Sequence, residues 1–164
     1  MNETNPSSPP PQLTPLQGFV LGWNRYAEFM GRSSRMEYWS FTIINMFIGI
    51  FLSLLAVIPG VIFNLVILIP SYAVLVRRLH DIGQSGLWVF GAVASWVAVI
   101  LVFIGKVSGS ISDHDFSGLL ILSGLFVAVM NLIPLIMCFV DGNPETNQYG
   151  PNPKLNPTNP NNPV

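Results

Sequence analysis

Three long stretches of this chain contain no Asp, Glu, Lys or Arg. They run from Tyr38 to Val76, from Ile82 to Gly105 and from Phe116 to Val140. A soluble domain needs charged residues on the outer faces of its helices and in its loops, so uncharged windows of this length are unusual in soluble proteins. A helix needs about 20 predominantly apolar residues to cross the hydrocarbon core of a bilayer. The three windows therefore predict an integral membrane protein.

The composition supports the same interpretation. The chain has 164 residues, of which 51% are hydrophobic and only 9% are charged, whereas an average soluble domain carries about 25% charged residues. Its formal net charge of −1 gives no reason to expect a nucleic-acid partner. The partners that we consider are membrane lipids, including anionic lipids, and further copies of the same chain.

The first window is too long for a single span, and it contains the turn dipeptide Pro59-Gly60. We therefore predict an all-α membrane protein with a four-helix transmembrane domain over residues 32–141. The four spans are expected at about residues 38–58, 61–79, 87–104 and 119–140.

The segment before the first span predicts a further helix. Over residues 13–31, apolar and aromatic side chains recur at helical spacing, with Thr14 as a candidate N-cap, Pro15 at the first helical position and Gly31 as a stop. We expect an N-terminal amphipathic helix lying in the membrane interface; a short helix packed on the bundle is the alternative. The Pro-rich residues 1–12 and the Asn/Pro-rich residues 142–164 are expected to form tails without regular structure.

The basic residues predict the orientation. Six lie on one side of the predicted spans and one, Lys106, lies on the other. Because Lys and Arg are enriched in cytoplasmic loops, we expect both termini in the cytoplasm. The six residues on the expected cytoplasmic side are Arg25, Arg32, Arg35, Arg77, Arg78 and Lys154.

Two short charged patches adjoin the spans. In the first, Ser34 and Glu37 have the spacing of a capping box, so Ser34 is expected to begin the first span. In the second, Arg77 and Asp81 are four residues apart and could pair on one helix face. Ser85 is a candidate cap for the next helix.

Both patches are expected to emerge on the same side of the membrane. One interpretation is an ion-paired lock between spans, with surplus cations on lipid phosphates. The other is a defined anion site for a lipid headgroup or a small phosphorylated ligand, because guanidinium groups match phosphate geometry and a histidine could tune such a site near neutral pH. The residues proposed for this site are Arg32, Arg35, Arg77, Arg78 and His80.

Polar residues inside the spans are few. Asn45 and Asn131 lie at depths that permit a contact between the first and fourth spans, and packing is the simplest role for them. We find no catalytic motif, and we predict no cofactor and no metal site. The sequence thus favours a non-enzymatic structural, interaction or lipid-binding protein; a small oligomeric channel or transporter is the alternative.

Two motifs and one later segment carry a family resemblance. The first motif reads Gly-Arg-Ser-Ser-Arg-x-Glu-Tyr-Trp from Gly31, the second reads Arg-Arg-Leu-His-Asp-Ile-Gly-x-Ser-Gly-x-Trp from Arg77, and Asn-Gln-Tyr-Gly-Pro follows from Asn147. Over about residues 23–153 the chain resembles the bacterial inner-membrane family typified by YhaH and YhaI, a domain of unknown function (805). The resemblance implies a four-helix protein of the bacterial inner (plasma) membrane, and it implies no reaction.

Overall fold

The computed structural model describes residues 12–155, and over this range the chain forms five α-helices and no strand. The helices are α1 (Pro15–Asn24), α2 (Arg35–Leu55), α3 (Val57–Asp81), α4 (Leu87–Val107) and α5 (Asp113–Met137). The last four are long and apolar enough to cross a membrane. The predicted all-α fold with four spans is confirmed. Residues 1–11 and 156–164 of the two predicted tails lie outside the described residues.

The predicted boundary between the first two spans is wrong. The chain turns at Ala56, whose φ of −164° and ψ of 152° separate α2 from α3, and not at Pro59-Gly60. Pro59 lies in the first turn of α3, where its missing N–H breaks no helical hydrogen bond. Gly60 is buried against Ser53 of α2, and a Cβ at Gly60 would overlap the Ser53 hydroxyl. The first turn of a helix was therefore mistaken for a turn between two helices.

The fourth span, α5, begins earlier than predicted. Its N-cap is Ser112, whose hydroxyl accepts a hydrogen bond from the Asp115 N–H at 3.2 Å. Asp113 and Asp115 thus lie in the first helical turn. Carboxylates in this position are favourable because the N-terminal end of a helix carries partial positive charge. Asp113 also forms an ion pair with Lys106 near the end of α4.

The N-terminal helix is shorter than predicted and packs on α2. Thr14 caps it through the Gln17 N–H and Pro15 is its first residue, but the helix ends at Asn24, well before Gly31. Two buried glycines allow the close approach to α2: a Cβ at Gly22 would overlap the ring of Phe41. The helix α1 therefore forms part of the folded body. Its other face leaves Leu16 and Val20 exposed, as a helix at a membrane interface would.

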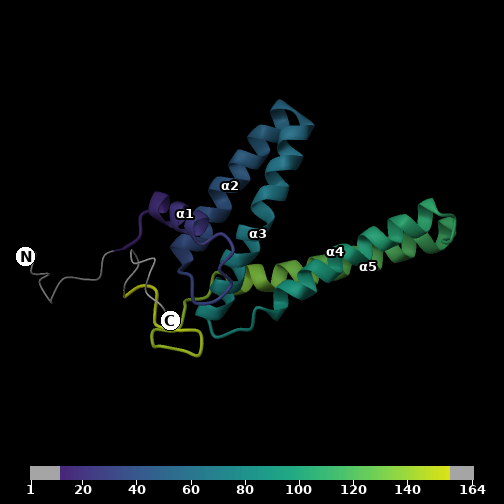
Figure 1. Cartoon of the computed structure of the whole chain (residues 1–164). Coiled ribbons are helices and arrows are strands. Elements are labelled where there is room, and N and C mark those ends of the chain that lie inside the picture. The colour runs from purple at the N-terminus through teal and green to yellow at the C-terminus, as the bar shows by residue number, and fades with distance from the viewer. Residues whose placement is uncertain (1–11, 156–164) are drawn as a thin grey trace, which may run out of the picture.

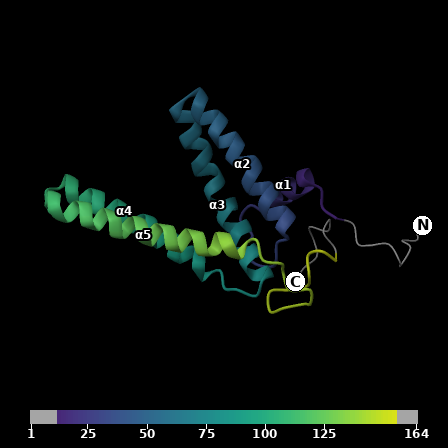
Figure 2. The same ribbon diagram turned by 180° about the vertical axis from the view of Figure 1, so that it is seen from behind.

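The four long helices form two hairpins, α2–α3 and α4–α5, which diverge from a common base (Figure 1; Figure 2 shows the same arrangement from behind). The main helix contact between the hairpins joins α3 to α4. A small apolar core lies where α2 and α3 meet the end of α5; its members are Tyr38, Phe41, Val74 and Cys138. The largest buried polar side chains lie at this base as well.

Candidate functional site

Five charged side chains are buried together at the base of the two hairpins. Their exposed fractions range from 0 to 3%. Such residues are almost never fully buried unless they are paired. We call this group the arginine cluster; it consists of Arg32, Glu37, Arg77, Arg78 and Asp81.

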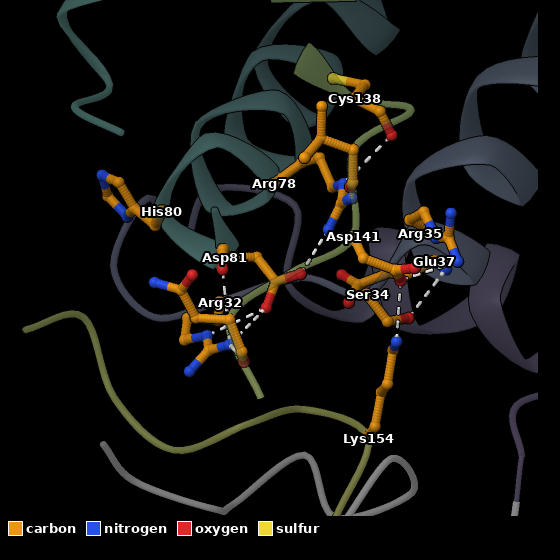
Figure 3. A network of polar contacts seen from close by, with 12 residues as sticks. Arg32, Ser34, Arg35, Glu37, Arg78, His80, Asp81, Cys138, Asp141 and Lys154 are labelled. Carbon is orange, nitrogen blue, oxygen red and sulfur yellow. Dashed lines mark hydrogen bonds and ion pairs between the residues drawn. The ribbon is translucent and has the colours of Figure 1, made fainter. Parts of the chain in front are cut away.

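Asp81, the last residue of α3, is shared by two guanidinium groups (Figure 3). The Nε of Arg32 donates to its Oδ1 at 2.9 Å, and Nη1 of Arg78 donates to its Oδ2. Arg78 lies three residues earlier on the same helix, whereas Arg32 comes from the segment between α1 and α2. One carboxylate therefore balances two buried cations from different parts of the chain.

Arg32 also holds the segment that follows α5. Its Nη1 donates to the carbonyl oxygens of Glu145 at 2.7 Å and Gly150 at 3.1 Å, and its Nη2 donates to that of Asn143. The Asn143 N–H in turn donates to the Asp81 carbonyl at 2.9 Å. We call residues 141–152 the C-terminal strap. The predicted unstructured tail is thus wrong for this part of the chain, because buried hydrogen bonds order it without a large apolar face.

His80 also contacts the C-terminal strap, through its ring and its backbone carbonyl. Its ring stacks on Tyr149 with centroids 3.7 Å apart and planes 2° from parallel. Its backbone carbonyl accepts a hydrogen bond from the Asn147 side-chain amide at 2.9 Å. The His80 Nδ1 lies 3.1 Å from the carbonyl oxygen of Gly31. His80 therefore packs between the strap and the segment that precedes α2.

Arg77 joins α3 to α2 and to the segment after α1. Its Nη2 donates to Glu37 Oε1 at 2.8 Å, and its Nη1 donates to the carbonyl oxygens of Arg25, at 2.9 Å, and Glu28. Ser34 caps α2 by accepting a hydrogen bond from the Glu37 N–H at 3.2 Å. The cap therefore places the Glu37 side chain on the first turn of α2, where it meets Arg77.

Arg78 reaches the end of α5. Its Nε donates to the Cys138 carbonyl at 3.3 Å and its Nη2 donates to that of Val140. The C-terminal end of a helix carries partial negative charge, so a cation is favourable there. Together with Asp81, this arginine connects the last turn of α3 to the end of the second hairpin.

The charges within the cluster do not cancel. Three arginines against Glu37 and Asp81 leave one net positive charge (3 − 2 = 1). Backbone carbonyl oxygens accept from most of the remaining N–H groups, and the buried Nε of Arg77 has no hydrogen-bond partner among the described residues. The cluster is therefore a cross-link between four segments of the chain, in which each of the three guanidiniums is already bonded to protein atoms.

Arg35 differs from the other arginines because 43% of its side chain is exposed. It pairs with Asp141 at 2.7 Å, and Asp141 also accepts from Lys154 at 3.1 Å (Figure 3). The hydrogen bond from Lys154 and the nearby positive charges hold the pKa of Asp141 below its ordinary value. This outer group of charges lies at the surface, beside the buried cluster.

Several predicted roles need correction. Arg77 pairs with Glu37 of α2 and not with Asp81, because the guanidinium reaches a carboxylate on the neighbouring helix. The N-cap of α4 is Gly86; the Ser85 hydroxyl accepts instead from the Leu87 N–H at 3.2 Å.

Asn45 and Asn131 do not form the predicted contact with each other. Each donates to a carbonyl four residues earlier on its own helix, Asn45 to Phe41 and Asn131 to Val127, both at 2.8 Å. Similar depth was insufficient to bring them together, because α2 and α5 belong to hairpins that diverge (Figure 1).

Sequence reasoning missed Gly142 in the strap. A Cβ at this position would overlap the Asp81 carboxylate, which Arg32 and Arg78 hold in place. Only glycine lets the backbone pass this close. A single glycine in an Asn/Pro-rich segment carried no sequence signal for this role.

We expect Gly142→Ala to destabilise the protein by about 1–3 kcal/mol, because overpacking at a fixed neighbour forces the surrounding groups apart. Thermal unfolding in a mild detergent measures this change. Gly124→Ala in α5 is the matched control, since a Cβ there meets nothing within 4 Å. Equal stability of the two variants would contradict the close contact with Asp81.

The helices and the cluster together define an all-helical, four-span membrane protein whose buried charged residues gather at one end. The sequence was compared with known protein families, and one family matches most of the chain. Residues 26–151 match the model of a family described as a protein of unknown function (DUF805). The chain belongs to this family, and the matched range contains the whole arginine cluster.

Two relatives from Escherichia coli strain K12 have similar sequences. The chain is 31% identical to inner membrane protein YhaI over 98 residues, which cover 54% of this chain and 83% of YhaI. It is 29% identical to inner membrane protein YhaH over 143 residues, which cover 80% of this chain and 92% of YhaH. No solved structure matches the chain.

Proposed function

We propose that this chain is a non-enzymatic protein of the bacterial inner membrane that serves as a structural and lipid-binding platform. One observation carries the proposal: four of the five residues suggested for an anion site are buried, and the three arginines among them are bonded to the chain's own carboxylates and carbonyls. Burial of this kind favours a structural role for the arginine cluster. It leaves Arg35 as the arginine best exposed for an outside ligand.

The proposed orientation places the arginine cluster on the cytoplasmic side. Six of the seven basic residues belong to this end of the molecule, and basic residues are enriched in cytoplasmic segments next to membrane spans. The inner-membrane relatives YhaI and YhaH support a bacterial inner membrane as the location.

The edge formed by Arg35 and α1 is the proposed lipid contact. A Cβ at Gly18 of α1 would lie 3.0 Å from the carbonyl oxygen of Met36, so α1 passes beside the first turn of α2, where Arg35 lies. The same helix exposes Leu16 and Val20. An exposed cation beside exposed apolar side chains suits the headgroup region of an anionic membrane.

Native mass spectrometry of the full chain with phosphatidylglycerol tests this function. We expect Arg35→Gln to lower the affinity for this lipid about fivefold, because one juxtamembrane cation contributes about 1 kcal/mol. Lys106→Gln is the matched control, since Lys106 is also paired with an aspartate but lies at the opposite end of its hairpin.

Equal retention of lipid by wild type and Arg35→Gln would overturn the lipid-binding part of the proposal. A solute-driven conductance in vesicles that contain the purified chain would instead support the channel or transporter alternative. Retained lipid together with no conductance is the result expected of a platform.

A further inference from the structure

A third asparagine, Asn64, lies in the membrane-spanning part of α3. It is seven residues from the start of the helix at Val57, or roughly 10 Å at 1.5 Å per residue. Its side chain is exposed, and large apolar side chains surround it on the same surface. Asn64 thus presents an amide at a depth where lipid tails supply no hydrogen-bond partner.

The bonding of Asn64 differs from that of the other two intramembrane asparagines. Asn45 and Asn131 each donate to a carbonyl of their own helix. Within residues 12–155, no hydrogen bond joins the Asn64 amide to another group. Its Oδ1 lies beside Gly49 of α2, 3.4 Å from where a Cβ would be. Placing an amide in hydrocarbon without a hydrogen-bond partner costs free energy. We therefore expect a group from outside the chain to form a hydrogen bond with Asn64.

Asn64 belongs to a regular stripe along α3. Val57, Val61, Asn64 and Leu68 follow one another at spacings of four, three and four residues, and all four are exposed. This spacing is that of the a and d positions in a coiled coil. The α4–α5 hairpin of the same chain diverges from the α2–α3 hairpin (Figure 1), and it leaves the side chains of the stripe exposed.

We propose that this stripe is the contact with a second copy of the chain, in which two α3 helices pack together and their Asn64 amides bond to each other. A carboxamide both donates and accepts hydrogen bonds, so an identical residue across a two-fold axis is a complete partner. A polar residue at one seam position also fixes register and oligomeric state. This dimer does not rest on the proposed platform function, which concerns the other end of α3.

Cysteine cross-linking of the full chain in lipid bilayers tests the stripe. In a Cys138→Ala background, Val61→Cys and Leu68→Cys lie on it. Ile62→Cys and Ile69→Cys are matched controls off the stripe, because the native side chains are 56% and 51% exposed against 52% and 50% for Val61 and Leu68. We expect severalfold more disulfide-linked dimer at the two stripe positions. Equal yields at all four positions, or no dimer at any, would overturn the proposal.

A second measurement tests the amide itself. We expect Asn64→Leu to weaken self-association in bilayers roughly three- to tenfold, the range for one hydrogen bond between membrane helices. Fluorescence energy transfer between labelled copies, diluted with increasing lipid, reports this change. Asn131→Leu is the control, because its amide is bonded within its own helix. Unchanged association of Asn64→Leu, or an equal loss in both variants, would overturn the amide contact.

Discussion

Replacing Asp81 by Asn is expected to destabilise the folded protein by about 3–5 kcal/mol, the cost of removing one partner from a buried ion pair. The asparagine side chain keeps the shape but removes the charge that balances both Arg32 and Arg78. Both guanidiniums are at most 3% exposed and would stay buried without this carboxylate. The protein is unfolded with increasing concentrations of a denaturing detergent, and tryptophan fluorescence monitors the transition. This experiment measures the loss in free energy of unfolding.

Asp141→Asn is the matched control for that experiment. Asp141 also accepts from two cations, Arg35 and Lys154, but its side chain is 62% exposed. Exposed ion pairs contribute little to stability because water and salt screen them. We therefore expect a small effect at Asp141. Similar losses at both aspartates would contradict a special role for the buried one.

Replacing Glu37 by Gln is the second change with a large expected effect, again about 3–5 kcal/mol. It leaves Arg77, which is 0% exposed, with carbonyl acceptors and no counter-charge. The same unfolding measurement applies. Glu28→Gln is the control, because Glu28 pairs with Arg25 at 2.8 Å while 47% of its side chain is exposed.

A double-mutant cycle separates the Arg77–Glu37 pair from the other contacts of each residue. We expect Glu37→Gln and Arg77→Gln together to cost about 0.5–3 kcal/mol less than the sum of the two single changes, because the double variant buries no unbalanced charge. Strict additivity would mean that the two side chains do not interact in the folded protein.

The absence of charge predicted the four spans because a bilayer restricts composition more strongly than a soluble fold does. The errors lie at the helix ends. Ser112 and Asp113 are polar, so hydropathy placed them outside a span, although they begin α5 as a cap and first turn. Pro59 was interpreted as part of a turn between two spans, but it lies at the start of α3, where a helix tolerates proline.

The candidate site was predictable in part. The residues of the arginine cluster were visible as two short charged patches, and the spacing of Ser34 and Glu37 indicated a cap. Their pairing was not visible, because Glu37 and Arg77 are 40 residues apart and Arg32 and Asp81 are 49 apart. Such pairs depend on how the helices pack.

The C-terminal strap was missed for a different reason. Its order comes from backbone carbonyls that accept from Arg32 and from a tyrosine ring stacked on His80. Every residue has a backbone carbonyl, so the sequence does not indicate which carbonyls accept a hydrogen bond. The surrounding Asn and Pro residues are typical of unstructured segments.

Proton exchange at the arginine side chains tests most directly whether the arginine cluster is closed and bonded to protein. In the full chain in lipid nanodiscs, nuclear magnetic resonance can follow exchange of each Nε–H with water. The structure predicts slow exchange for Arg32 and Arg78, whose Nε–H groups donate to Asp81 and to the Cys138 carbonyl. It predicts fast exchange for Arg35, with 43% of its side chain exposed. Equally fast exchange at all three would contradict the buried cluster and favour an open anion site.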